Sequence, residues 1–261
     1  MRRRNGTDRR EGILDIKKKD MKKHNPLLLP ENDPMGAAIA DYSTLGEASR
    51  LRVFSPMFDE DEIPVETLFR DVEDMPEIER EALGLARGRT LDVGAGAGCH
   101  SLALQARGIR VEAIDISPLA VKTMRARGVR HVCQKDLFDV RDPYDTILML
   151  MNGIGIVGTC ARLPQFFHLL DEILLPGGQL LCDSTDIRYV FDDDEPIDQM
   201  INYYGELVYK MQYKEIVGNS FPWLYIDADT LGGIAATCGY HLEVAAKGDN
   251  DSYLAIITKK G

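Results

Sequence analysis

Short apolar runs alternate with longer segments of about three helical turns between residues 89 and 183. The apolar runs have the length of buried strands, and their spacing leaves room for one helix after most of them. We therefore expect strands at 89–93, 110–114, 130–134, 145–151 and 178–183, and helices near 98–107, 117–127 and 160–174. Strands that alternate with helices form parallel sheets covered on both faces, so the pattern predicts an α/β fold.

This alternation stops after residue 184. The segment 185–226 looks like an insertion, and its alternating apolar and polar positions suit one or two added strands. A helix is expected near 227–238, followed by strands at 240–247 and 252–259. The sequence GDND between these last two strands predicts a hairpin turn.

The part of the chain before residue 89 is expected to form separate segments. Residues 26–88 are predicted to be an N-terminal helical cap segment, with helices within 33–46 and 75–88 and a strand-like run at 51–55. Residues 1–25 are predicted to be a disordered basic leader, and Met21 is an alternative start of the chain. The remaining residues, 89–261, would then be one domain carrying the insertion 185–226.

Charge and composition exclude several classes of partner. The net charge is −11, and residues beyond the basic leader carry most of the acids, so a phosphate backbone would be repelled and nucleic acid is not an expected partner. No apolar run approaches the roughly 20 residues of a membrane span, and the basic start lacks the apolar segment of a secretion signal. We expect a cytoplasmic protein without membrane association, with five reduced cysteines and no metal site.

The stretch TLDVGAGAGCH, residues 90–100, predicts a nucleotide-binding loop. A strand, a glycine turn and a helix present backbone N–H groups to a ligand, but Cys99 stands where a dinucleotide fingerprint has its last small residue. Asp92 ends the strand just before Gly94. A carboxylate at about 4–6 Å from a phosphate would cost on the order of 3–4 kcal/mol, so the loop favours a phosphate-free, cationic ligand such as S-adenosylmethionine (SAM).

With these residues the sequence resembles the class I SAM-dependent methyltransferases, whose first motif is an acidic residue followed by G-x-G-x-G. The resemblance implies a Rossmann-like fold with a mostly parallel seven-stranded sheet and an antiparallel C-terminal hairpin strand. It also implies SAM as cofactor, bound by residues of four loops: Asp92, Gly94, Ala95 and Gly96 in the glycine loop, Asp115 and Ile116 at the ribose, Asp136 and Leu137 at the adenine, and Asn152 and Gly153 between methyl donor and acceptor. Tyr42 is expected to fold over the cofactor from the N-terminal segment.

Three of these acids have alternative structural roles. Asp92 and Asp115 could each cap the helix that follows, although one carboxylate offers two oxygens at the spacing of the ribose hydroxyls. Asp136 could be a plain loop acid, because Asp139 and Asp142 lie nearby and could contact the adenine instead.

The methyl acceptor is expected to be a small molecule, methylated at oxygen or nitrogen. Methyl transfer from a sulfonium needs an aligned acceptor and, for a weak nucleophile, a base, for which His100 and Asp186 are candidates. The loop MNGIGIVG lacks the N-P-P-aromatic signature of enzymes that methylate amide or base nitrogens. An NAD(P)-dependent oxidoreductase and a noncatalytic cofactor-binding module remain as alternatives, and a homodimer is left open.

Overall fold

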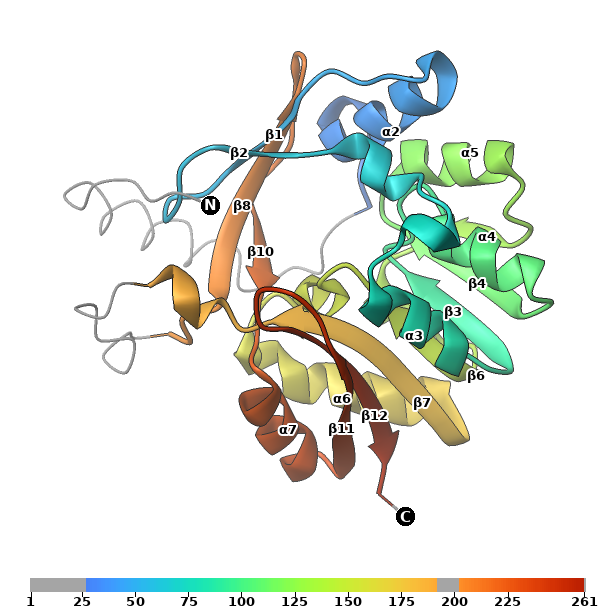
Figure 1. The fold of residues 1–261 in the computed structure, drawn as a ribbon, viewed down its shortest axis with the longest axis vertical. Helices are drawn as coiled ribbons and strands as arrows, with labels where there is room; N and C mark the ends of the chain where they lie inside the picture. The colour runs from blue at the N-terminus through green and yellow to red at the C-terminus, as the bar shows by residue number, and fades with distance from the viewer. Residues whose placement is uncertain (1–26, 192–201, 261) are drawn as a thin grey trace.

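The central element of the fold is a seven-stranded sheet (Figure 1), seen in a computed structural model that describes residues 27–191 and 202–260. Its strands are β3 (Arg89–Val93), β4 (Arg110–Asp115), β5 (Val132–Gln134), β6 (Tyr144–Met149), β7 (Leu174–Thr185), β11 (Tyr240–Lys247) and β12 (Ser252–Lys259). The order of the strands is β11-β12-β7-β6-β3-β4-β5. The five strands β7, β6, β3, β4 and β5 pair in parallel, and β12 is antiparallel to both of its neighbours, β11 and β7. The predicted α/β fold with an antiparallel terminal hairpin is confirmed.

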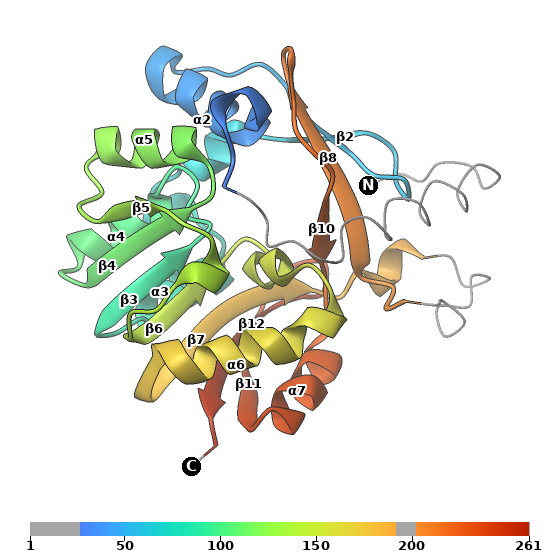
Figure 2. The same cartoon turned by 180° about the vertical axis from the view of Figure 1, so that it is seen from behind.

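Helices cover both faces of this sheet (Figures 1 and 2). On one face α3 (Glu77–Leu85) and α4 (Cys99–Ala106) pack through a buried cluster that includes Ala82, Leu104 and Leu148, with α5 (Pro118–Arg127) beside them. On the other face α6 (Leu163–Ile173) and α7 (Ala228–Thr237) bury Phe166 and Leu231 against the strands. Burial on both faces explains why the strands are almost continuously apolar in sequence. Within the described residues, no helix combines the length and hydropathy that crossing a membrane requires.

The C-terminal hairpin turns at the predicted position. Asn250 and Asp251 have φ values of 52° and 56°, as the two central residues of a type I′ turn require. The backbone N–H of Asp186 donates to the carbonyl oxygen of Asp251 at 3.1 Å. The tip of the hairpin therefore lies beside the carboxyl end of β7.

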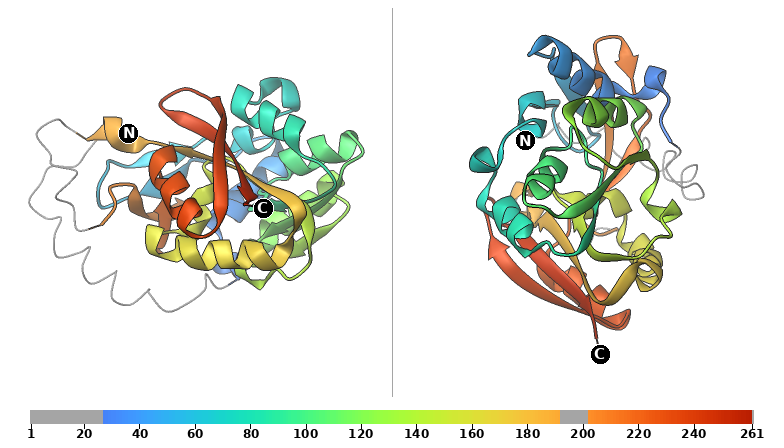
Figure 3. Two further views of the ribbon diagram at one scale, coloured as in Figure 1. Left: turned by 90° about the horizontal axis from the view of Figure 1, so that it is seen from below. Right: turned by 90° about the vertical axis from the view of Figure 1, so that its right-hand side faces the viewer.

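A second, antiparallel sheet joins two distant parts of the sequence. Its strands are β1 (Leu51–Phe54), β2 (Asp61–Ile63), β8 (Glu206–Tyr213), β9 (Ile216–Val217) and β10 (Phe221–Leu224), in the order β10-β8-β1-β2 with β9 paired to β8. In Figure 3 (right) the turn between β8 and β9 (orange) lies at the top of the molecule, and the C-terminal end of β12 lies at the bottom.

The prediction that residues 26–88 form a helical cap segment is incomplete, because this segment also contains strands of the second sheet. That segment also supplies β1 and β2, and Arg52 pairs with Gln212 of the insertion. Local periodicity predicts that a strand exists but carries no information about a partner so far along the chain. The division into domains stays a prediction, and the leader 1–25 lies outside the described residues.

One carboxylate attaches the N-terminal helix α2 (Pro34–Leu45) to the main domain. Asp33 is fully buried and accepts hydrogen bonds from the backbone N–H of Gly36 at 2.8 Å and from the Ser117 hydroxyl at 2.6 Å. The same Ser117 oxygen accepts from the N–H of Ala120 and so caps α5. The first turns of α2 and α5 are thus joined through a shared pair of caps.

We expect Asp33→Ala to lower the free energy of unfolding by about 2–3 kcal/mol, because it removes a helix cap and leaves the buried Ser117 hydroxyl without its acceptor. Urea denaturation followed by circular dichroism measures the change. Glu47→Ala, at an exposed carboxylate just after α2, is the control and should stay within about 0.5 kcal/mol of the wild type. Equal effects of the two substitutions would contradict the role of Asp33.

Candidate functional site

The glycine loop connects β3 to α4 at the carboxyl edge of the sheet. Gly94, Gly96 and Gly98 all lie in the left-handed region, with φ values of 67°, 56° and 84°. Any other residue would be strained at these positions. The N–H groups of Gly94 and Ala95 donate to the Ile114 carbonyl at 2.9 and 3.1 Å, which ties the loop to β4. A side chain at Gly96 would point into open space, so the backbone there is accessible to a ligand.

Asp115 lies at the end of β4 and holds the glycine loop from the side. Its Oδ2 accepts from the N–H of Gly96 at 2.9 Å, and its Oδ1 accepts from the N–H of Ser117 at 2.8 Å. Burial raises the pKa of this carboxyl to about 6, although both backbone hydrogen bonds favour the charged form. Beside it, the carbonyl of Ile116 accepts from Leu28 N at 3.0 Å, so the N-terminal segment crosses the end of β4.

Asp92 faces the protein interior. Its side chain is only 2% exposed, and its Oδ2 accepts a 2.6 Å hydrogen bond from the hydroxyl of Ser101 in the first turn of α4. Burial raises the pKa of Asp92, while the charge of nearby His100 and the bonds from Ser101 oppose the shift. These contacts correspond to the helix-capping alternative that the sequence left open. Contact of Asp92 with the cofactor stays a prediction.

Asp136 and Leu137 lie in the loop after β5. The Oδ1 of Asp136 accepts from the N–H of Phe138 at 2.7 Å and caps the short 3₁₀ helix η4 (Leu137–Asp139). Leu137 is 3% exposed and belongs to the main core. Contact of these two residues with adenine stays a prediction.

The loop after β6 has a strained backbone. It contains Asn152 and Gly153, which are predicted to lie between methyl donor and acceptor, and these two residues are called the lip below. Met151 and Asn152 have φ values of 65° and 55°, a conformation that costs such residues of order 1–3 kcal/mol. Two side chains of β7 hold it in place: Asp183 accepts from Gly153 N at 3.2 Å, and the Thr185 hydroxyl donates to Asn152 Oδ1 at 2.8 Å. Burial raises the pKa of Asp183 to about 6. Asp183 is not among the site residues expected from the sequence. The only sequence signal for it is that an acid ends a predicted apolar strand, 178–183.

A cavity of about 240 Å³ adjoins this lip. It lies between the end of β7, the second sheet and the tip of the C-terminal hairpin. Among the described residues that line it are Asn152, Thr185, Tyr189, Leu207, Tyr225 and Asp249, and none of the lining residues is Lys, Arg or His. The cavity therefore combines aromatic and apolar walls with a few polar groups and offers no positive charge to an anionic ligand.

The two candidate bases differ in position. His100 is 5% exposed, and its Nε2 lies 2.6 Å from Glu79 Oε2. Burial lowers the pKa of His100, but its contacts with Cys99 and Glu79 raise it well above the usual value, which favours the protonated ring over a free base. Asp186 follows β7 beside the cavity, where it accepts a 2.6 Å hydrogen bond from the Tyr204 hydroxyl.

Tyr42 contacts the glycine loop only through intermediaries. Its ring packs on Phe69 with centroids 4.7 Å apart, and the Arg127 guanidinium lies 4.7 Å from the centre of the same Phe69 ring. Arg127 Nη1 in turn donates to the carbonyl of Ala97 at 2.6 Å. A direct contact of Tyr42 with the cofactor stays a prediction.

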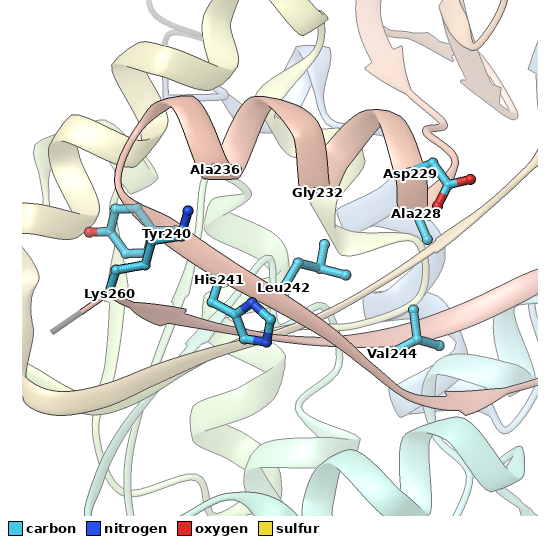
Figure 4. A pocket seen from close by; sticks show the side chains of 9 residues that line it. All are labelled: Ala228, Asp229, Gly232, Ala236, Tyr240, His241, Leu242, Val244 and Lys260. Carbon is cyan, nitrogen blue, oxygen red and sulfur yellow. The ribbon is translucent and has the colours of Figure 1, made fainter.

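A larger groove of about 370 Å³ lies elsewhere, between α7 and β11 (Figure 4). Gly232 leaves space for it, and Tyr240, Leu242 and Val244 form part of its wall. Strands β12, β7 and β6 separate β11 from the glycine loop. The smaller cavity, whose lining includes Asn152 and Thr185, is therefore the one at the carboxyl edge of the main sheet, where the glycine loop also lies. No group of three or more metal-ligating side chains occurs in residues 27–191 and 202–260.

Comparison with known proteins identifies the family. The model of a methyltransferase domain matches residues 91–182. A SAM-dependent methyltransferase from Bacteroides fragilis, crystallised with S-adenosylhomocysteine (SAH), is 52% identical, with a TM-score of 0.85 over 90% of this chain and 98% of that one. The chain belongs to the SAM-dependent methyltransferases.

A curated relative of the methyltransferase matches a shorter part of the chain. A ubiquinone biosynthesis O-methyltransferase from Xylella fastidiosa is 32% identical over 109 residues, which are 38% of this chain and 43% of that protein. The chain thus matches less than half the length of this relative. The CcbJ methyltransferase of Streptomyces caelestis shares the fold, with 13% identity, a TM-score of 0.58 and coverage of 89% and 100%. Family membership removes the oxidoreductase and the noncatalytic module as alternatives.

The contact between the lip and the second sheet allows a direct test. A Cβ at Gly155, in the 3₁₀ helix η5 (Gly153–Val157), would lie 2.3 Å from the ring of Trp223. We expect Gly155→Ala to destabilise the methyltransferase by about 1–3 kcal/mol through overpacking. Because Trp223 is the single tryptophan, its fluorescence should change as well.

The matched control is Gly233→Ala in α7, where nothing lies within 4 Å of the added Cβ. Alanine is favoured over glycine in a helix, so this variant should gain about 0.5–1 kcal/mol. Thermal unfolding and tryptophan emission measured on both variants separate the two outcomes. An unchanged emission spectrum for Gly155→Ala would show that the lip does not press on Trp223.

Proposed function

We propose that the methyltransferase binds SAM across the carboxyl ends of β3, β4 and β5 and transfers its methyl group to oxygen or nitrogen of a small molecule. The observation that carries this proposal is the geometry of Asp115 beside the open glycine loop. An ionised carboxylate has about four lone-pair sites, and the N–H groups of Gly96 and Ser117 use two of them. The remaining sites suit the two hydroxyls of a ribose.

The other predicted cofactor contacts fit around this position. The backbone of Gly94, Ala95 and Gly96 forms the loop where the methionine part would pass, and its N–H groups are already bonded to Ile114 and Asp115. Ile116 and the pair Asp136–Leu137 follow the next two strands, where the adenine would lie. The SAH bound to the Bacteroides relative supports the same choice of cofactor.

The acceptor would occupy the cavity beside Asn152. Methyl transfer forms a bond from the acceptor atom to the methyl carbon while the carbon–sulfur electron pair stays with sulfur, so alignment is the main requirement. The walls offer Tyr189, Tyr225 and Leu207 for an apolar body, and Asp249 is the charged residue in the lining. This composition favours a small neutral or cationic acceptor over a carboxylate or a phosphate.

Asp186 is the candidate base for a hydroxyl acceptor. It lies between the lining residues Thr185 and Ile187, and its carboxylate is held by the hydroxyl of Tyr204. The O-methyltransferase relative supports oxygen as the acceptor atom, but its match covers less than half of that protein. An amine that arrives unprotonated would need no base, so both acceptor atoms remain in the proposal.

Calorimetry with SAH tests the cofactor site through its pH dependence. With the Asp115 pKa at about 6, the carboxylate is ionised at pH 7.5 and mostly protonated at pH 5. Because the ribose hydroxyls need the ionised form as acceptor, we expect affinity to fall about tenfold between these values. Asp115→Asn should weaken binding at pH 7.5 by about 1–3 kcal/mol and remove most of the pH dependence.

The control is Asp74→Asn, at an exposed aspartate that ends the short 3₁₀ helix η3 (Val72–Asp74). It should leave both the affinity and the pH profile unchanged. Absence of SAH binding by the wild type would refute the proposed site, and an unaltered Asp115→Asn would remove Asp115 from it. Incubation with methyl-labelled SAM and a panel of small alcohols, phenols and amines then tests the transfer itself.

A further inference from the structure

A buried network of charged side chains lies next to the glycine loop. Its centre is Glu79 of α3, which is 4% exposed. Glu79 Oε1 accepts from the Arg70 guanidinium, and Glu79 Oε2 lies 2.6 Å from His100 Nε2. His100 is itself 5% exposed, so the network holds two cationic groups on one buried carboxylate.

The charges around His100 come from several elements. Glu79 faces it from α3, Asp92 from β3, Asp183 from β7 and the Cys99 thiol from its own helix. Buried carboxylates are tolerated only when they are paired and hydrogen-bonded. A protonated His100, together with Arg70, offsets two of the charges that Glu79, Asp92 and Asp183 carry when ionised. Loss of this proton would remove one of these two cations from the buried carboxylates.

The network connects two segments that enclose the glycine loop. His100 follows Gly98 by two residues and lies in the first turn of α4. On the other side, Arg127 donates to the carbonyl of Ala97 at 2.6 Å and reaches that of Phe69 at 3.4 Å. Phe69 immediately precedes Arg70, and Leu68 and Ile39 share a buried cluster with Ala97. The loop is thus fixed between α4 and the N-terminal segment.

We propose that Glu79 is a positioning residue for the cofactor, because it joins His100 to Arg70 and so fixes the first turn of α4 against the segment that covers the glycine loop. The inference rests on the cofactor site proposed above. Glu79 and His100 do not touch the reacting atoms. Their role is to keep the backbone of the glycine loop in the geometry that the cofactor needs.

The protonation of His100 can be measured without any ligand. In the wild-type protein, we expect the NMR signals of the His100 imidazole to be those of the doubly protonated ring from pH 6 to pH 8. In Glu79→Gln the carboxylate charge is removed, so the ring should titrate within this range. A wild-type His100 that titrates near its ordinary value of about 6.5 would overturn the proposal.

Binding of SAH provides the second readout. We expect Glu79→Gln to weaken SAH binding at least fivefold and to add a new pH dependence between pH 6 and pH 8. The control is Glu62→Gln, at an ion pair with Arg50 whose side chains are 49% and 69% exposed, and it should change affinity less than twofold. Circular dichroism at the temperature of the titration verifies that each variant is folded.

The outcomes separate this inference from the cofactor site itself. A wild type that does not bind SAH refutes the site, whereas wild-type binding with equal affinity in folded Glu79→Gln refutes the positioning role. If Glu79→Gln does not fold, His100→Gln takes its place, and unchanged SAH affinity in that variant also counts against the proposal. A double variant should be no weaker than the weaker single one, because both substitutions break the same network.

Discussion

The backbone between β3 and α4 adopts a left-handed conformation at three alternate residues, and hydrogen bonds to β4 hold it there. Ile114 accepts from Gly94 and Ala95, and Asp115 accepts from Gly96. Since β3 and β4 are neighbours in a parallel sheet, the loop and the acid that supports it are brought together by the register of two buried strands. The cofactor site therefore depends on the packing of the sheet as much as on its own residues.

The acceptor side is built from different parts of the chain. Strained residues after β6 are held by Asp183 and Thr185. The second sheet packs on the same loop through Trp223 and lines the cavity through Leu207. The cofactor half matches a family model over residues 91–182. The second sheet lies outside this range, which explains why the motifs identify the cofactor more readily than the acceptor.

The sequence predicted the main sheet well, because its strands are buried on both faces and end at glycine-rich or polar turns. Strands at 89–93, 240–247 and 252–259 have the expected bounds. The pairing of β1 with β8 could not be predicted, since local periodicity does not specify a remote partner. A role for Glu79 could not be predicted for a similar reason, because a glutamate in a helix is usually solvent-exposed and only the tertiary structure buries this one. The motif also indicates Asp92 as a site residue but does not predict the direction of its side chain, which accepts a hydrogen bond from Ser101.

The second sheet has a consequence for biosynthesis. Strands β1 and β2 leave the ribosome early, but β8, the other partner of β1, is translated only after most of the main domain. Such distant pairings form slowly, and unpaired strand edges are prone to association until they are covered. The nascent chain must therefore carry an open β-edge while its parallel sheet assembles, so the acceptor side would be the last part of the protein to mature.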